Sequence, residues 1–202
     1  MLAKLFQEIE AMLARCDGWC ELEKANALAA MVLALRPKIV IEIGVYGGRS
    51  LQAFALPMKH LQYGCVIGID PWSNQASLAD MADQKNIEFW ASLDHERIYQ
   101  RCLNNISLSD LGPYAKIIRQ KSDDVDPSWW EIDLLHVDGS HEETAYRDIV
   151  RYGARVRQGG ICVCDDTGWS SGAPARGVDW LLANGFIHLY PLGTGAVYQR
   201  VR

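Results

Sequence analysis

The stretch VIEIGVYGGRS, residues 40–50, decides the fold of this 202-residue chain. It starts as an apolar, largely β-branched run, which is typical of a strand buried on both faces. The run carries one acid, Glu42, and leads into three glycines, Gly44, Gly47 and Gly48. Glycine lets the backbone adopt left-handed conformations and lets a ligand approach the main chain closely. A buried strand that carries an acid into such a turn indicates a ligand-binding turn rather than plain core.

Outward from this stretch, apolar runs of strand length alternate with segments of helical periodicity. The predicted strands are residues 39–43, 65–69, 115–118, 132–137 and 161–164. The predicted helices are residues 2–13, 21–35, 50–60, 88–104, 142–156 and 175–184. Residues 186–192 and 196–201 flank a glycine-rich turn, which is a hairpin signal. This order predicts an α/β fold with a doubly wound, mostly parallel sheet, helices on both faces and a C-terminal antiparallel hairpin.

Composition and charge are those of a folded globular protein. Hydrophobic residues make up 49% of the chain and charged residues 22%, and the length favours a single domain, 1–202. We expect a helical cap at 1–36 and a core at 37–202, in which 72–112 forms a lid or substrate wall. The net charge of −5 gives no attraction to nucleic acid or anionic lipid, and no apolar run approaches the ~18 residues of a membrane span. The six cysteines are expected to be core residues of a cytoplasmic protein.

Acidic residues stand at the carboxyl ends of four predicted strands. They are Glu42, Asp70, Asp138, Asp165 and Asp166. In open α/β sheets, ligands bind beyond this edge of the sheet. A lone aspartate after a strand is usually a helix cap, but five acids at four strand ends predict a functional edge.

The glycine turn fits neither of two common phosphate-binding motifs. Gly44 is followed by Val45 and Tyr46 before the next glycine, so G-x-G-x-x-G is absent, and no Gly-Lys-Ser/Thr follows as in a P-loop. Glu42 would also repel a pyrophosphate. S-adenosylmethionine suits the turn better, because its sulfonium and ammonium are cationic and its carboxylate can meet a helix N-terminus and the Ser50 hydroxyl.

The segment EIGVYGGRS, residues 42–50, resembles the first motif of class I S-adenosylmethionine-dependent methyltransferases. Its E-x-G-x-Y-x-G-x-S form is similar to that of the catechol-type, metal-dependent O-methyltransferases. Residues 134–169, LLHVDGSHEETAYRDIVRYGARVRQGGICVCDDTGW, and 177–186, GVDWLLANGF, resemble relatives that act on macrolide sugars and cephalosporin-hydroxylase-like proteins. The likeness covers roughly residues 38–202 and implies a Rossmann-like fold.

The resemblance assigns cofactor contacts to matching positions. The methionine end of S-adenosylmethionine is assigned to Glu42, Gly44, Tyr46, Gly48 and Ser50. Asp70 is assigned to the two ribose hydroxyls, and Ser122 with Asp123 to the adenine. Trp72 packs either near the adenine or in the core. Asp138 is assigned to the cofactor site as well as to a metal site.

The same resemblance matches Asp138, Asp165 and Asp166 to a divalent-metal site, which implies Mg²⁺. Carboxylates at adjacent strand ends would repel one another without a cation, and oxygen ligands suit magnesium. Alternatively, Asp165 or Asp166 caps the following segment. His141 matches the position of the family's base, or else it opens a helix in solvent. His136, inside a strand, is expected to be a packed core histidine or a partner of the metal ligands.

Together these expectations describe a Mg²⁺-dependent O-methyltransferase that uses S-adenosylmethionine to methylate a small-molecule hydroxyl. The metal would lower the pKa of the acceptor hydroxyl, and His141 would take its proton. Trp169 and Arg176 are candidate substrate contacts, or they pack within their loop. The alternatives are a metal-independent methyltransferase, a non-catalytic S-adenosylmethionine-binding or assembly domain, and a metal-dependent hydroxylase-like enzyme. The first helices are expected to cap the cofactor site or to form the face of a homodimer.

Overall fold

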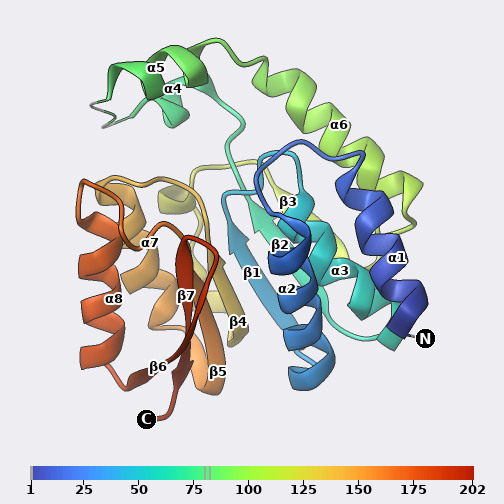
Figure 1. Ribbon diagram of the computed structural model, residues 1–202. Coiled ribbons are helices and arrows are strands. Elements are labelled where there is room, and N and C mark those ends of the chain that lie inside the picture. The colour runs from blue at the N-terminus through green and yellow to red at the C-terminus, as the bar shows by residue number, and fades with distance from the viewer. Residues whose placement is uncertain (1, 80, 82) are drawn as a thin grey trace.

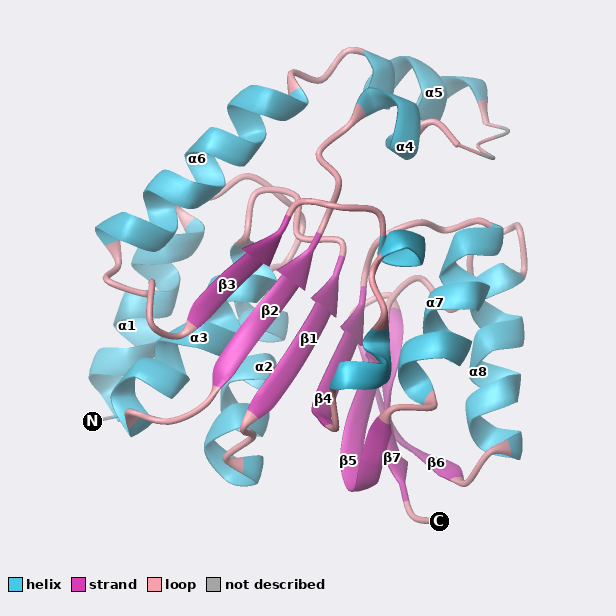
Figure 2. Ribbon diagram, turned by 180° about the vertical axis from the view of Figure 1, so that it is seen from behind, coloured by secondary structure: helices cyan, strands magenta, loops and turns pink. Residues whose placement is uncertain are grey.

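The computed structural model describes residues 2–79, 81 and 83–202. A seven-stranded sheet with the order β3-β2-β1-β4-β5-β7-β6 crosses the molecule, and helices cover both of its faces (Figures 1 and 2). The strands are β1 Ile39–Ile43, β2 Cys65–Ile69, β3 Ala115–Ile118, β4 Ile132–Val137, β5 Val156–Cys164, β6 Phe186–Leu192 and β7 Gly195–Arg200. The helices are α1 Leu2–Leu13, α2 Leu22–Leu35, α3 Arg49–Leu61, α4 Asn74–Ser77, α5 Gln84–Ala91, α6 His95–Leu108, α7 Glu143–Gly153 and α8 Ala173–Ala183, with short 3₁₀ helices η1 Ser122–Asp124 and η2 Pro127–Trp129.

The sheet is parallel from β3 to β5, and β7 and β6 add an antiparallel edge. Its order reverses at β1, which pairs with β2 on one side and with β4 on the other. Ligands of open α/β sheets bind at such a switch point, beyond the carboxyl ends of the strands. The predicted fold class is confirmed, and the predicted strands Ile39–Ile43, Cys65–Ile69, Ala115–Ile118 and Ile132–Val137 have the predicted bounds.

Two apolar layers hold the sheet between its helices. On one face, α1, α2 and α3 pack on the sheet with α6 beside them, through residues such as Ile9, Leu28 and Phe54. On the other face, α7 and α8 pack through Tyr152 and Leu181. Each of these five side chains is fully buried. None of the described helices is long and apolar enough to span a bilayer.

Three predicted elements differ from the structure by more than two residues at an end. The helix predicted at 142–156 ends earlier, at Gly153, and Val156 already belongs to strand β5. The helix predicted at 88–104 is divided into α5 and α6, because the Asp94 side chain accepts a hydrogen bond from the Arg97 backbone N–H and starts a new helix. Strand β5 begins at Val156 rather than at 161, and the register of its pairing with β4 shifts along this segment. A Cβ on Gly160 would lie 2.8 Å from Val156 Cγ1, so this irregular part of the strand is too tightly packed for a larger residue.

Helices α4 and α5 lie beyond the carboxyl ends of the parallel strands, at the top of Figure 1. They belong to the segment 72–112, which the sequence predicts to be a lid or substrate wall. Its role as a lid stays a prediction.

Candidate active site

The glycine turn between β1 and α3 is held by the Asp70 carboxylate. Asp70 Oδ2 accepts hydrogen bonds from the backbone N–H groups of Val45 at 2.9 Å and Tyr46 at 3.0 Å. Its Oδ1 accepts from the Trp72 backbone N–H at 2.7 Å. Asp70 therefore fixes the turn from the end of β2, and its predicted contact with ribose hydroxyls stays a prediction.

Helix α3 starts from this turn with its N-terminus at the edge of the sheet. Gly48, the N-cap, has a φ of +84°, and a Cβ there would lie 2.7 Å from Cys102 Sγ. Ser50 is in the first helical turn and is buried. Exposed backbone N–H groups at a helix N-terminus favour an anion such as a carboxylate. The contact of this turn with the methionine end of the cofactor stays a prediction.

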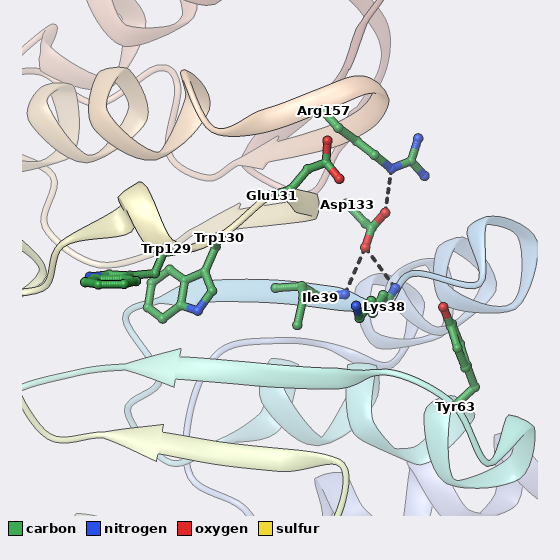
Figure 3. Close-up of a pocket in the computed structure, with 8 residues that line it drawn as sticks. All are labelled: Lys38, Ile39, Tyr63, Trp129, Trp130, Glu131, Asp133 and Arg157. Carbon is green, nitrogen blue, oxygen red and sulfur yellow. Dashed lines mark hydrogen bonds and ion pairs between the residues drawn. The ribbon is translucent and has the colours of Figure 1, made fainter.

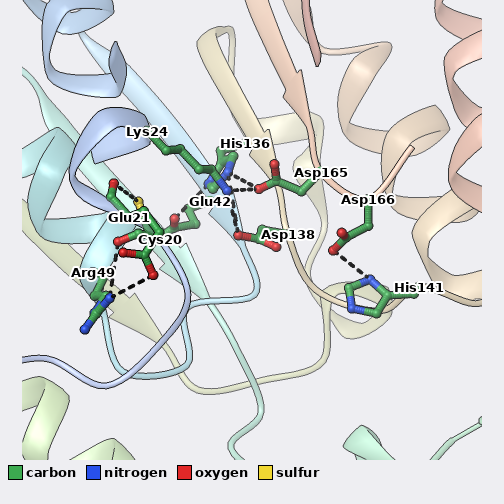
Figure 4. Close-up of polar contacts among 10 residues, drawn as sticks. All are labelled: Cys20, Glu21, Lys24, Glu42, Arg49, His136, Asp138, His141, Asp165 and Asp166. Carbon is green, nitrogen blue, oxygen red and sulfur yellow. Dashed lines mark hydrogen bonds and ion pairs between the residues drawn. The ribbon is translucent and has the colours of Figure 1, made fainter. Parts of the chain in front are cut away.

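A chain of five charged or polar side chains lies beside the turn, and we call it the buried polar chain (Figure 4). Glu42 and His136 are direct register partners on β1 and β4, and Glu42 Oε1 lies 2.8 Å from His136 Nδ1. His136 Nε2 lies 2.9 Å from Asp165 Oδ2. The Lys24 ammonium contacts both Asp165 Oδ2 and Asp138 Oδ2, the latter at 3.2 Å. Side chains from the cap and three strands therefore form one connected group.

The burial of Glu42 restricts how it can interact with the cofactor. Glu42 is 0% exposed and faces His136, so it lies beneath the turn rather than on its surface. Its Oε2 atom is buried without a hydrogen-bond partner among the described residues. Glu42 can therefore act on the cofactor only through its field or through water.

Burial and pairing perturb the titration of the buried polar chain. Burial lowers the pKa of His136, but the stronger combined effect of Asp165 and Glu42 raises it to about 10. Burial and the neighbouring Asp165 raise the pKa of Asp138 to about 8. Burial opposes ionisation of Asp165, yet His136 and Lys24 hold its pKa below the ordinary value. The neighbouring carboxylates thus favour the charged form of the His136 imidazole.

These shifts predict that the protein loses stability on the alkaline side. The folded pKa of His136 is raised from 6.5, so its contribution is complete below pH 6.5 and is lost as pH rises through about 10. Asp138, also raised, acts in the same direction up to about pH 8. Urea unfolding between about pH 7 and 9 is expected to give a free energy that falls by up to about 1.4 kcal/mol per pH unit for each retained proton. His136→Gln is the control and is expected to show a flatter profile; a flat wild-type profile would contradict the prediction.

The three predicted metal ligands do not come together. Asp138 and Asp165 meet, and their carboxylates with His136 form a group whose ligand atoms lie within 4.8 Å of one another. Asp166 is outside this group, since its Oδ2 lies 3.4 Å from His141 Nδ1 instead (Figure 4). Successive residues after a strand point in different directions, and Asp166 has a φ of +49°. The predicted base and one predicted metal ligand thus form a separate pair.

The structure places the remaining candidates around this edge. Ser122 and Asp123 are in η1, where Asp123 pairs with Arg147 at 2.9 Å and Arg151 at 3.2 Å. Their predicted contact with the adenine of the cofactor stays a prediction. Trp72 is 3% exposed and donates from Nε1 to the Tyr46 carbonyl at 2.9 Å, so it packs beneath the turn.

The two substrate candidates in the loop before α8 have partners of their own. The Trp169 ring lies 4.4 Å from the His141 ring, centroid to centroid. Arg176 bonds Glu143 and lies over the Tyr146 ring at 5.0 Å. Trp169 therefore borders the His141–Asp166 pair, whereas Arg176 is engaged in packing α8 against α7.

Aromatic residues from the cap and from α5 meet over the glycine turn. The Tyr46 ring lies 5.0 Å from the Trp19 ring and 5.7 Å from the Trp90 ring. Trp19 is 61% exposed and also contacts Phe89 at 5.9 Å. The segment 72–112 and the cap at 1–36 thus both reach the turn.

A shallow pocket lies at the opposite edge of the sheet, at the start of β1 and β4 (Figure 3). Its polar centre is Asp133, which accepts hydrogen bonds from the backbone N–H groups of Lys38 at 2.8 Å and Ile39 at 2.9 Å. Arg157 pairs with the other carboxylate oxygen at 2.5 Å. These hydrogen bonds and this ion pair connect the amino ends of β1 and β4 to the start of β5. The groups are therefore engaged in holding the sheet together, and the candidate active site lies at the carboxyl ends of the strands.

Lys24 is the one member of the buried polar chain that the sequence reasoning missed. It is the only basic residue of the predicted helix 21–35, among largely apolar neighbours. That isolation is the signal that could have identified it. Its partners, Asp138 and Asp165, are more than a hundred residues away along the chain.

Residues 41–167 match the sequence profile of a family described as a methyltransferase domain. The chain belongs to this methyltransferase family. The match covers the glycine turn, Asp70, Asp138 and both residues of the Asp165–Asp166 pair. The resemblance of the turn to class I methyltransferases is thereby confirmed. A comparison with curated proteins found no matching relative.

Solved methyltransferase structures share the fold of the whole chain. The Podospora anserina methyltransferase PaMTH1, bound to S-adenosylhomocysteine, has a TM-score of 0.64 and 15% identity, over 98% of this chain and 87% of that chain. The Streptomyces achromogenes O-methyltransferase TomG, in complex with S-adenosylmethionine, gives 0.63 and 12%, over 100% and 89%. A Staphylococcus aureus protein assigned as a caffeoyl-CoA O-methyltransferase gives 0.66 and 13%, over 100% and 97%. At these identities the likeness is one of fold.

Proposed function

We propose that this methyltransferase transfers the methyl group of S-adenosylmethionine to a hydroxyl of a small molecule. The observation that carries the proposal is the glycine turn, which opens onto the N-terminus of α3 at the switch point of a methyltransferase fold. The O-methyltransferase TomG and the S-adenosylhomocysteine-bound PaMTH1 share that fold and support the choice of cofactor and acceptor atom.

In the proposed complex the methionine carboxylate meets the N-terminus of α3 and Ser50, where free N–H groups and a hydroxyl can donate to it. Gly44 and Gly48 let the turn pack closely against Asp138 and Cys102, where a Cβ would clash. Ser122 with Asp123 would border the adenine, and Asp70 the ribose. The acid-rich edge favours the sulfonium, which is cationic.

His141 is the proposed base, oriented by Asp166. The 3.4 Å contact between Asp166 Oδ2 and His141 Nδ1 leaves Nε2 to take a proton, and the Trp169 ring holds the imidazole from one side. The acceptor oxygen would attack the methyl carbon in line as the carbon–sulfur bond breaks. Its proton goes to His141, and S-adenosylhomocysteine leaves.

The predicted magnesium ion does not fit the side chains as they are arranged. Asp166 faces His141, and the Lys24 ammonium lies on the two carboxylate oxygens, one from Asp138 and one from Asp165, that would hold the ion. We therefore assign no step of the reaction to a metal, and the metal-independent alternative has a specific observation in its favour. The cytoplasmic location and the homodimer stay predictions from the sequence.

Calorimetry with S-adenosylmethionine, followed by a screen of hydroxyl acceptors, tests the proposed function. We expect binding that S-adenosylhomocysteine displaces, and methyl transfer to at least one acceptor. His141→Gln is expected to lower kcat by about 100-fold or more with little change in cofactor affinity, because it removes the base but not the turn. Binding without turnover for any acceptor would favour the assembly-domain alternative, and no binding would refute the proposal.

A further inference from the structure

The Lys24 ammonium occupies the position between Asp138 and Asp165 where a divalent cation would be needed. Its Nζ contacts Oδ2 of both carboxylates. The Lys24 side chain is 13% exposed and that of Asp165 is 2% exposed, so the contact is shielded from solvent. Two carboxylates at adjacent strand ends need a shared proton or a positive charge to lie together, and the Lys24 ammonium is a positive charge that the chain itself places there.

Both ring nitrogens of His136 are already engaged by carboxylates. Its Nδ1 lies 2.8 Å from Glu42 Oε1 and its Nε2 lies 2.9 Å from Asp165 Oδ2. A metal ion would have to displace one of these contacts to reach the imidazole.

The backbone that carries Lys24 is fastened to the glycine turn. Arg49 Nε donates to the Cys16 carbonyl at 2.9 Å, and Gln52 Nε2 lies 3.0 Å from Cys16 Sγ. A Cβ on Gly47 would lie 2.2 Å from the Asp17 carbonyl oxygen, so the cap rests directly on the turn. Lys24 lies in the first turn of α2, seven residues after Asp17. Its ammonium is therefore a built-in part of the edge and not a surface charge that happens to reach it.

We propose that Lys24 is the resident cation of this edge and replaces the divalent metal, so that the protein neither binds nor needs one. The part of this inference that concerns catalysis rests on the proposed function. The part that concerns metal binding is independent of it. An ammonium has three N–H donors, and the two carboxylates use two of them. The third can orient an acceptor oxygen, a task that elsewhere falls to a metal ion.

Manganese binding, read by calorimetry and by electron paramagnetic resonance, tests the inference without any acceptor. We expect chelator-treated wild-type protein to show no stoichiometric Mn²⁺ binding at the edge. Lys24→Ala is expected to bind Mn²⁺ there at least about tenfold more tightly than wild type does, because a like charge has been removed from beside the carboxylates. Lys24→Arg is expected to behave as wild type. Lys59→Ala, which removes a lysine bonded to the Ser109 carbonyl, is the matched control and should gain nothing.

Stoichiometric Mn²⁺ binding by wild-type protein that Asp138→Asn abolishes would overturn the inference, and that measurement needs no Lys24 variant to fold. A folded Lys24→Ala protein with no gain in Mn²⁺ affinity would overturn it as well. Failure of the proposed function would appear differently, as absence of S-adenosylmethionine binding. Where turnover is found, full activity of wild type in chelator is the expected result, and its loss with recovery on Mg²⁺ counts against the inference.

Discussion

Gly44→Ala is expected to lower the affinity for S-adenosylmethionine by about 100-fold and to destabilise the protein by about 3 kcal/mol or more. Gly44 has a φ of +85°, which is strained for alanine. A Cβ there would also lie 2.3 Å from the Asp138 carbonyl oxygen and 2.4 Å from Gly139 Cα. Both obstacles are backbone atoms, so no side chain can rotate away, and the turn must separate from the end of β4.

Urea unfolding and calorimetric titration with S-adenosylmethionine measure the two effects. Gly112→Ala is the matched control, because no atom lies within 4 Å of its added Cβ and its φ is not positive. We expect that control to bind cofactor as wild type does. Wild-type affinity in Gly44→Ala would show that the cofactor does not depend on the close approach of β1 and β4 at this turn.

The parallel core was predictable because its strands are buried on both faces. Such strands read as continuous apolar runs, and β1 and β2 show this in IVIEI and CVIGI. The antiparallel hairpin followed from the glycines between two apolar segments. Strand β5 was predicted too short because its first residues, VRQGG, are polar and glycine-rich, and only their pairing beside β4 identifies them as strand.

The site was predictable only where strand direction alone determines which end of the sheet a residue occupies. Acids at the carboxyl ends of parallel strands must share an edge, and Asp138 and Asp165 do meet there. Two further facts depend on register and side-chain direction, which a single sequence does not specify. Glu42 is opposite His136 only because of the β1–β4 register, and Asp166 diverges from Asp165 because the backbone turns at its positive φ.

The position of Lys24, which the N-terminal cap contributes to the site, could not be predicted from the sequence either. Lys24 reaches the edge only because α2 packs on α3, and no local pattern announces that contact. A family motif carries over residue by residue where the chain matches it, and the cap lies outside the matched residues 41–167. The charge that decides whether a metal is needed is therefore found in the part of the chain that the motif does not cover.

Asp165→Asn is expected to destabilise the protein by about 3 kcal/mol, whereas Asp166→Asn should cost less than about 1 kcal/mol, although the two residues are neighbours. The Asp165 side chain is 2% exposed and accepts from both Lys24 and His136, so losing its charge leaves two buried cations with one carboxylate fewer. The Asp166 side chain is 21% exposed, and its Oδ2 lies 3.4 Å from His141 Nδ1. Asparagine is suited to the positive φ of Asp166, so the substitution there tests charge rather than strain.

Urea unfolding of both variants, together with methyl-transfer assays, separates the roles of the two aspartates. We expect Asp166→Asn to stay within about 1 kcal/mol of wild-type stability but to lose activity, because the imidazole of His141 is no longer oriented by a carboxylate. A metal site built from Asp138, Asp165 and Asp166 would respond differently, since losing either Asp165 or Asp166 would weaken metal binding alike. Equal loss of stability in both variants, relieved in neither by Mg²⁺, would contradict the assignment of Asp165 to the buried polar chain and of Asp166 to the base.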